Sequence, residues 1–165
     1  MNGRWWRNFG ALFSPGFAAV AFYRLDRAAY LSLGSAWPAV RLGLCPLIAL
    51  IRPWVGSCEI HYQADIGPGF LVLHPSLGVV VSGQATVGSR LTLTGGNCLG
   101  MRGHPSAPSF VIGSDVDMGA NSTVLGPLVM GDDVRVGAGA VVLDDVPSGS
   151  SVVGVPARVV GTLAD

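Results

Sequence analysis

The most constraining feature of the sequence is an apolar residue that returns at every sixth position. A helix with 3.6 residues per turn cannot hold a step of six for long, whereas short strands joined by tight turns can. A second set of apolar or small residues follows the first at a spacing of four. The first set is Ile112, Met118, Val124, Met130, Val136 and Val142, and the second is Val116, Ser122, Leu128, Val134, Ala140 and Val146.

A period this regular indicates a stacked repeat, in which each unit buries its inward residues against its neighbours. We predict a mainly β protein, a left-handed parallel β-helix with three flat faces in each coil. Six residues in each face give about 18 residues per coil, and the coils should stack like the strands of any parallel sheet.

The sixfold step begins before this stretch, at Ile60, and two breaks interrupt it. Three extra residues lie between Val72 and Val81, in a bulge that contains His74. After Leu99, thirteen residues rather than twelve lead to Ile112, through a segment rich in Gly and Pro that predicts a projecting loop. The remaining residues are enough for about four coils.

The residues before the repeat predict helices. An amphipathic pattern extends from Gly16 to Leu33, where Gly34 should end the helix. A second helix is expected over 36–51, with Pro38 in its first turn and Pro46 as a point of kinking or division. The chain is therefore divided into a helical N-terminal segment (1–58), the β-helix (59–150) and a C-terminal tail (151–165).

The N-terminal segment is basic, and two interpretations of it stay open. Residues 1–58 carry six Arg and one Asp, a charge of +5, which residues 59–165 balance at −5. Trp5, Trp6 and the arginines are typical of contact with a membrane surface. The simpler interpretation is a helical cap, because the first coil of a β-helix is an open edge that must be covered.

Composition points to an oligomer inside the cell. Hydrophobic residues make up 50% of the 165 residues and charged residues 12%, so part of the surface should be covered by other subunits. The three cysteines lack the spacing of a disulfide framework or a zinc site. No secretory pattern is present, and the longest apolar run, 42–51, is about half of a membrane span. We expect a cytoplasmic protein, with the inner face of the membrane as the alternative, and no nucleic-acid partner.

Chemistry is most plausible where the repeat fails. The sequence contains no serine-hydrolase elbow, phosphate loop or dinucleotide fingerprint, which leaves His61, His74 and His104 as the main candidates. Of these, His74 lies in the first break, and residues that interrupt a regular scaffold are more often functional than structural.

Several motifs resemble the hexapeptide-repeat acyltransferases of the serine acetyltransferase type. This family includes O-acetyltransferases that modify sugars and exopolysaccharides. The similarity covers about residues 59–161. Its motifs are Glu59-Ile60-His61, Ile66-Gly67-Pro68-Gly69, Leu73-His74, Gly78-Val79-Val80-Val81, Leu125-Gly126, Val136-Gly137-Ala138-Gly139-Ala140-Val141-Val142 and Gly154-Val155-Pro156-Ala157-Arg158-Val159-Val160-Gly161.

The resemblance implies a homotrimer or a dimer of trimers, with the active sites between subunits. His74 would be the general base, and Glu59, two positions before His61, would orient it where the family has Asp. A neutral imidazole with a pKa of about 6.5 suits removal of a hydroxyl proton. The alkoxide-like oxygen would attack the thioester of acetyl-CoA directly, without a metal.

The resemblance also implies the residues that bind the two substrates. A small-molecule acceptor would be held by His61, Arg102 and His104. Acetyl-CoA, the co-substrate, would be held by Gly119, Ala120, Gly137, Pro156 and Arg158, although tight turns also require small residues at such positions.

The acceptor and two other classes of function stay open. Serine or a similar amino acid is one acceptor, and a sugar or polysaccharide precursor is the other, because the short basic N-terminal segment resembles acetyltransferases of exopolysaccharide assembly. A metal-dependent hydratase of the carbonic anhydrase type would use the three histidines as ligands. The third possibility is a non-catalytic trimer that binds partners.

Overall fold

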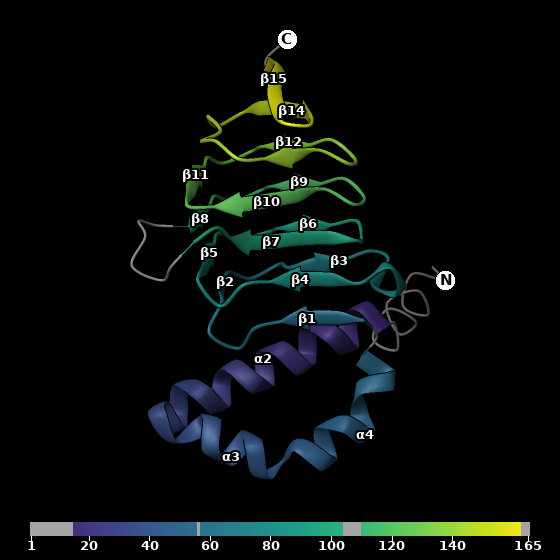
Figure 1. Ribbon diagram of the computed structural model, residues 1–165, viewed down its shortest axis with the longest axis vertical. Coiled ribbons are helices and arrows are strands. Elements are labelled where there is room, and N and C mark those ends of the chain that lie inside the picture. Colours follow the sequence, from purple (N-terminus) through teal and green to yellow (C-terminus); the bar gives the residue numbers. More distant parts are fainter. Residues whose placement is uncertain (1–14, 56, 104–109, 163–165) are drawn as a thin grey trace, which may run out of the picture.

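The computed structural model describes residues 15–55, 57–103 and 110–162. Within these ranges, three α-helices lie at one end, coils of short strands stack above them, and a hairpin lies at the opposite end (Figure 1). Successive strands pass in turn through three sheets, which we call the first, second and third faces.

The strands within each face are parallel, apart from the terminal pair β14 and β15, which is antiparallel. The first face contains β1 (Cys58–Ile60), β4 (Val79–Val81), β7 (Asn97–Met101), β10 (Thr123–Gly126) and β13 (Val141–Val142); the second contains β2 (Asp65–Ile66), β5 (Ala85–Val87), β8 (Phe110–Ile112) and β11 (Leu128–Met130); the third contains β3 (Leu71–Val72), β6 (Thr92–Leu93), β9 (Asp117–Met118), β12 (Arg135–Val136), β14 (Ser150–Gly154) and β15 (Ala157–Thr162).

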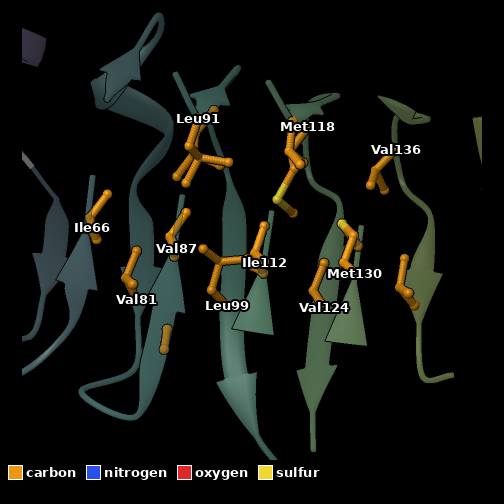
Figure 2. Close-up of a cluster of buried hydrophobic side chains, with 14 of the residues drawn as sticks. Ile66, Val81, Val87, Leu91, Leu99, Ile112, Met118, Val124, Met130 and Val136 are labelled. Carbon is orange, nitrogen blue, oxygen red and sulfur yellow. The ribbon is translucent and has the colours of Figure 1, made fainter. Parts of the chain in front are cut away.

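The inward residues of the repeat form one continuous core. Both predicted sets are buried throughout, and Ile112 and Met118 each keep 1% of their surface exposed. Figure 2 shows side chains from different faces pointing toward one another inside the prism. The inward apolar residues of each coil pack against those of the coils above and below, so their burial depends on stacking. The predicted parallel β-helix with a short helical N-terminal segment is confirmed.

The register gives the size of the two insertions. A plain coil brings Val124 beside Val142, 18 residues later. Ile60 pairs with Val81, 21 residues later, so the predicted three-residue insertion is confirmed. Leu99 pairs with Val124, 25 residues later, which makes the second insertion seven residues long. The prediction of one extra residue there is wrong, because Leu99 and Ile112 are consecutive members of the repeat and no member lies between them.

The helical segment comprises α2 (Pro15–Leu33), the 3₁₀ turn η1 (Gly34–Ala36), α3 (Trp37–Gly43) and α4 (Cys45–Val55). Helix α2 ends as predicted, and Pro38 lies in the first turn of α3. The second predicted helix divides at Leu44 rather than at Pro46, and it continues beyond Ile51. Proline lacks the N–H that an interior position needs, so the chain breaks just before it and Pro46 lies in the first turn of α4.

Helix α2 covers the open edge of the first coil. The Tyr23 hydroxyl donates to the carbonyl of Ala64 (2.9 Å) and accepts from the N–H of Ile66 (3.3 Å). Arg24 donates to the carbonyl of Ile66 and Arg27 to that of Ala64. These groups have no strand below them, and leaving them unpaired when buried would be costly. The helices therefore form the cap that the first coil requires.

The contacts of α2 account for part of the basic charge of the N-terminal segment. Arg24 and Arg27 bind the first coil, and Arg41 pairs with Asp26 inside the cap. Trp5 and Trp6, on which a membrane contact was predicted, lie outside the described residues. Within the described ranges, no helix is both long enough and apolar enough to cross a bilayer.

Candidate functional site

His74 lies at the edge where the third face turns into the first, just before the short 3₁₀ turn η2 (Pro75–Leu77). Its backbone is fixed, since its N–H donates to the carbonyl of Thr94 (2.9 Å) and its carbonyl accepts from the N–H of Leu77 (3.1 Å). Its side chain is exposed. The insertion thus holds a histidine firmly by its backbone and leaves the imidazole accessible.

Small residues continue along the edge beside His74 toward the later coils. Thr94 donates to the carbonyl of Met118, and Gly119, the next residue, donates to that of Val136, so the ladder that starts at His74 leads directly to Gly119 and Gly137. A groove with a volume of about 400 Å³ lies on the third face, lined by Leu73, Gly119 and six other residues. Three predicted coenzyme residues, Gly119, Ala120 and Gly137, therefore share an edge with His74.

Packing between coils also requires these glycines. A Cβ atom at Gly119 would lie 2.6 Å from the backbone nitrogen of Ala138, and one at Gly137 would lie 2.7 Å from a methyl group of Val153. Such distances are too short for non-bonded carbon and nitrogen atoms. The glycines therefore let successive coils approach closely at these two positions, where no side chain projects.

Glu59 and His61 lie together in another groove, which has a volume of about 440 Å³. We call it the first-face groove. Glu59 projects from β1, and His61 directly follows that strand. Gly103, which directly precedes residues 104–109, also lines this groove. The structure therefore brings Glu59 and His61 close to Gly103, at the base of the predicted projecting loop, whereas His104 itself lies outside the described residues.

The His61 ring is held on three sides. Its Nδ1 accepts the backbone N–H of Gln63 (3.2 Å), and its ring stacks on Tyr62 with centroids 4.5 Å apart. A Cβ atom at Gly83 would lie 2.4 Å from that Nδ1, so only glycine allows the ring to approach the backbone of the next coil. Gly83 was missed by the sequence analysis, because one glycine at a turn is no signal on its own.

Burial lowers the pKa of His61 below its ordinary value, and the positive charge of Arg41 lowers it further. The carboxylates of Asp26 and Glu59 act in the opposite direction. The neutral imidazole is thus favoured, and with Nδ1 accepting a hydrogen bond, the other nitrogen carries the proton and can donate to an acceptor.

His74 and Glu59 are not joined within one chain. Among the described residues, no hydrogen bond or ion pair links them. Strands β1 and β4 are parallel neighbours, His61 follows β1, and His74 precedes β4, so the two histidines lie at opposite ends of the first face. In the parts of the chain that the structure describes, no three His, Cys, Asp or Glu side chains are grouped as metal ligands.

Arg102 is oriented toward later coils. Its Nη2 donates to the carbonyl of Leu143 (2.6 Å), and its backbone N–H donates to that of Gly126 (2.6 Å). The guanidinium thus ties successive coils of the first face together. It does not join Glu59 and His61 in the first-face groove.

The last two predicted coenzyme residues lie in the terminal hairpin. Pro156 occupies the turn between β14 and β15, and Arg158 follows in β15. The Arg158 guanidinium lies 3.6 Å from the carboxylate of Asp144 and is exposed. In the third face, β14 lies two strands beyond β9, which Gly119 follows, and β15 lies three strands beyond it, near the end at which the coils stop.

Comparison with known proteins identifies relatives among acetyltransferases. The serine acetyltransferase of Synechococcus elongatus is 36% identical over 148 residues, which cover 88% of this chain and 57% of that protein. The putative colanic acid biosynthesis acetyltransferase WcaB of Escherichia coli K12 is 37% identical over 131 residues, which cover 77% of this chain and 76% of WcaB. The chain spans about half the length of the first of these relatives. No protein-family model matches the chain.

Solved structures agree with the sequence relatives. The crystal structure of serine acetyltransferase from Neisseria gonorrhoeae has a TM-score of 0.77 at 31% identity, covering 92% of this chain and 55% of that one. The structure of a serine acetyltransferase in complex with CoA has a TM-score of 0.73 at 26% identity. The match covers 90% of this chain and 58% of that one. With more than two thirds of WcaB matched, the chain belongs to the hexapeptide-repeat acetyltransferases of the serine acetyltransferase type.

Proposed function

We propose that the chain transfers the acetyl group of acetyl-CoA to a hydroxyl group of a small acceptor. The observation that carries the proposal is the exposed imidazole of His74 at the start of an edge of small residues. The thin pantetheine arm would lie along this edge, past Gly119, Ala120 and Gly137. Its thioester would then lie beside His74. The complex of a relative with CoA supports this assignment.

In the proposed reaction, His74 takes the proton of the acceptor hydroxyl as its oxygen attacks the thioester carbon. A C–O bond forms, and the carbonyl oxygen carries the negative charge of the tetrahedral intermediate. The C–S bond then breaks, and the imidazolium of His74 returns its proton to the CoA sulfur. Acetyl ester and CoA leave, so protons and electrons balance without a metal, and neither Cys58 nor Cys98 takes part.

Glu59 and His61 would complete the site from a neighbouring copy in a homotrimer. They lie at the other end of the first face from His74, and a threefold arrangement of prisms can bring such opposite ends together between subunits. Glu59 would then orient the His74 ring and stabilise its imidazolium form, while His61 would bind the acceptor. A dimer of trimers through the caps is the larger alternative.

We propose serine or a similar amino acid as the acceptor of the acetyl group, with a sugar as the alternative acceptor. The solved structures reported above are serine acetyltransferases, whereas WcaB is matched over more of its own length. We also assign the enzyme to the cytoplasm, since its three cysteines are unpaired.

The decisive experiment replaces His74 by Ala and measures acetyl-CoA consumption with a panel of amino-acid and sugar acceptors. Loss of a general base lowers kcat by about 10²–10⁴-fold. CoA affinity, measured by calorimetry, should stay unchanged. Ser76→Ala, in the same insertion, is the matched control. Near-normal turnover in His74→Ala would refute the proposal, and a stoichiometric zinc in the purified protein would favour the hydratase instead.

A further inference from the structure

A cavity with a volume of about 200 Å³ lies between the helical cap and the first coil. We call it the cap cavity. Ala19, Phe22 and Ile48 give it an apolar side, and Cys58 and Glu59 of β1 line it from above. Arg41 of α3 contributes the positive charge. Its volume is below the roughly 300–1,000 Å³ of pockets for drug-sized ligands, so it suits a small metabolite.

Arg41 is held in place before any ligand arrives. Its Nε donates to the carboxylate of Asp26 (3.1 Å), and the indole N–H of Trp37 donates to the same carboxylate (2.8 Å). The Asp26 side chain is only 4% exposed. The guanidinium carbon of Arg41 also lies 5.4 Å from the centre of the Tyr62 ring. A buried carboxylate and an aromatic face thus fix one edge and one side of the guanidinium.

The other edge of the Arg41 guanidinium is available. Its two Nη groups donate no hydrogen bond to any residue in the described ranges, and 39% of the side chain is exposed. By contrast, the guanidinium groups of Arg24, Arg27 and Arg102 donate to backbone carbonyls. A fixed guanidinium with free N–H groups matches the two oxygens of a carboxylate.

Glu59 connects this cavity to the catalytic chemistry, because it lines both the cap cavity and the first-face groove. A ligand whose carboxylate lay against Arg41 would extend toward Glu59, where an ammonium or hydroxyl group finds a partner. The negative charge of Glu59 makes the cavity unfavourable for a dianion such as phosphate.

We propose that Arg41 binds the carboxylate of the acceptor, so that the acceptor is a small hydroxyl compound with a carboxylate beside its hydroxyl. This inference rests on the proposed function and narrows it to hydroxy amino acids or acidic sugars. It also gives the acceptor a partner in the cap, where the resemblance implied Arg102 among the acceptor-binding residues. The cap is then part of the acceptor site as well as a cover for the first coil.

The test measures ligand binding to the full chain by calorimetry, without acetyl-CoA. Serine is compared with serinamide, and glucuronate with glucose, so that each pair differs in the carboxylate. The wild-type protein should bind either serine or glucuronate. Arg41→Gln should lower the affinity for that ligand at least tenfold, to the affinity of its analogue without the carboxylate. Arg41→Lys, which keeps the charge beside Asp26 but lacks the fork, should give an intermediate loss.

Arg27→Gln is the matched control, because it removes a cap arginine bonded to Gln63, Ala64 and Asp65 rather than to the cavity. It should bind as the wild type does. Equal affinity of serinamide and serine, unchanged binding in Arg41→Gln, or no binding of either carboxylate to the wild type would overturn the inference. Acceptor binding that depends on Arg41 without any acetyl transfer would instead defeat the proposed reaction.

Discussion

The protonation state of the His61 imidazole is determined by the groups around it. His61 stacks on Tyr62 and accepts a hydrogen bond from the N–H of Gln63, and burial is the largest cause of its lowered pKa. The folded protein therefore favours the neutral ring. In the unfolded chain the same side chain takes up a proton at its ordinary pKa of about 6.5.

This difference fixes the direction of one pH effect. As the pH falls through about 6.5, the unfolded chain binds a proton at His61 before the folded protein does, so the free energy of unfolding decreases. Above that pH both states are neutral there and the contribution is constant. Denaturant titrations should show that His61→Gln loses less stability than the wild type between about pH 7.5 and 5. Parallel stability curves for the two proteins would contradict this. His74→Gln is the control, because it removes a histidine that lies outside the first-face groove.

The sequence predicted the roles of some candidate residues better than those of others. His74 was predicted from a break in the repeat, because an insertion of three residues is visible against a strict period. The role of Arg102 was not predictable in the same way, since its partner, the carbonyl of Leu143, lies 41 residues later. Arg41 was missed because it precedes the repeat and its fixed geometry depends on contacts with Asp26 and Tyr62.

At the scale of elements, the sixfold repeat predicts the positions of the strands, but it predicts the two insertions only in part. Each repeat member makes the same contact in its coil, so local sequence determines which residues point inward. The second insertion was underestimated because the thirteen residues from Leu99 to Ile112 are close to two steps of six. Only the pairing of Leu99 with Val124 shows that one step and seven inserted residues are present.

The attachment of α2 to the first coil leads to a prediction for the cap. Tyr23 is 1% exposed, and its hydroxyl serves both a donor and an acceptor of the coil edge. Tyr23→Phe leaves the N–H of Ile66 without that partner and should lower the free energy of unfolding by about 1–3 kcal/mol. Chemical denaturation measures the change.

Tyr30→Phe is the control for that substitution. Tyr30 lies on the same helix and packs against Tyr62, and its hydroxyl donates to no residue that the structure describes. Its loss should change stability by less than about 0.5 kcal/mol. If both variants lose the same amount, the hydrogen bonds of Tyr23 do not anchor the cap.

At the scale of the whole molecule, the surface around His74 is unusually apolar for a site exposed to water. Leu73 is 50% exposed, Leu77 56% and Val80 46%, and all three lie within six residues of the histidine. Exposed apolar residues gathered at one place indicate contact with another protein surface. The proposed homotrimer would cover them and would enclose His74 between subunits, where the first-face groove of the neighbouring copy would supply Glu59 and His61.

Leu77→Asp tests whether that enclosure exists. A carboxylate placed in an apolar interface loses its water without gaining a partner, so the trimer should dissociate. Sedimentation velocity should give the mass of three chains for the wild type and of one chain for the variant, with the acetyl-transfer rate falling together with the mass. Leu50→Asp, at a 73% exposed position of α4, should leave the trimer intact and at most separate paired trimers. A Leu77→Asp protein that remained trimeric would mean that subunits meet elsewhere, and His74 would then have to work without the neighbouring Glu59.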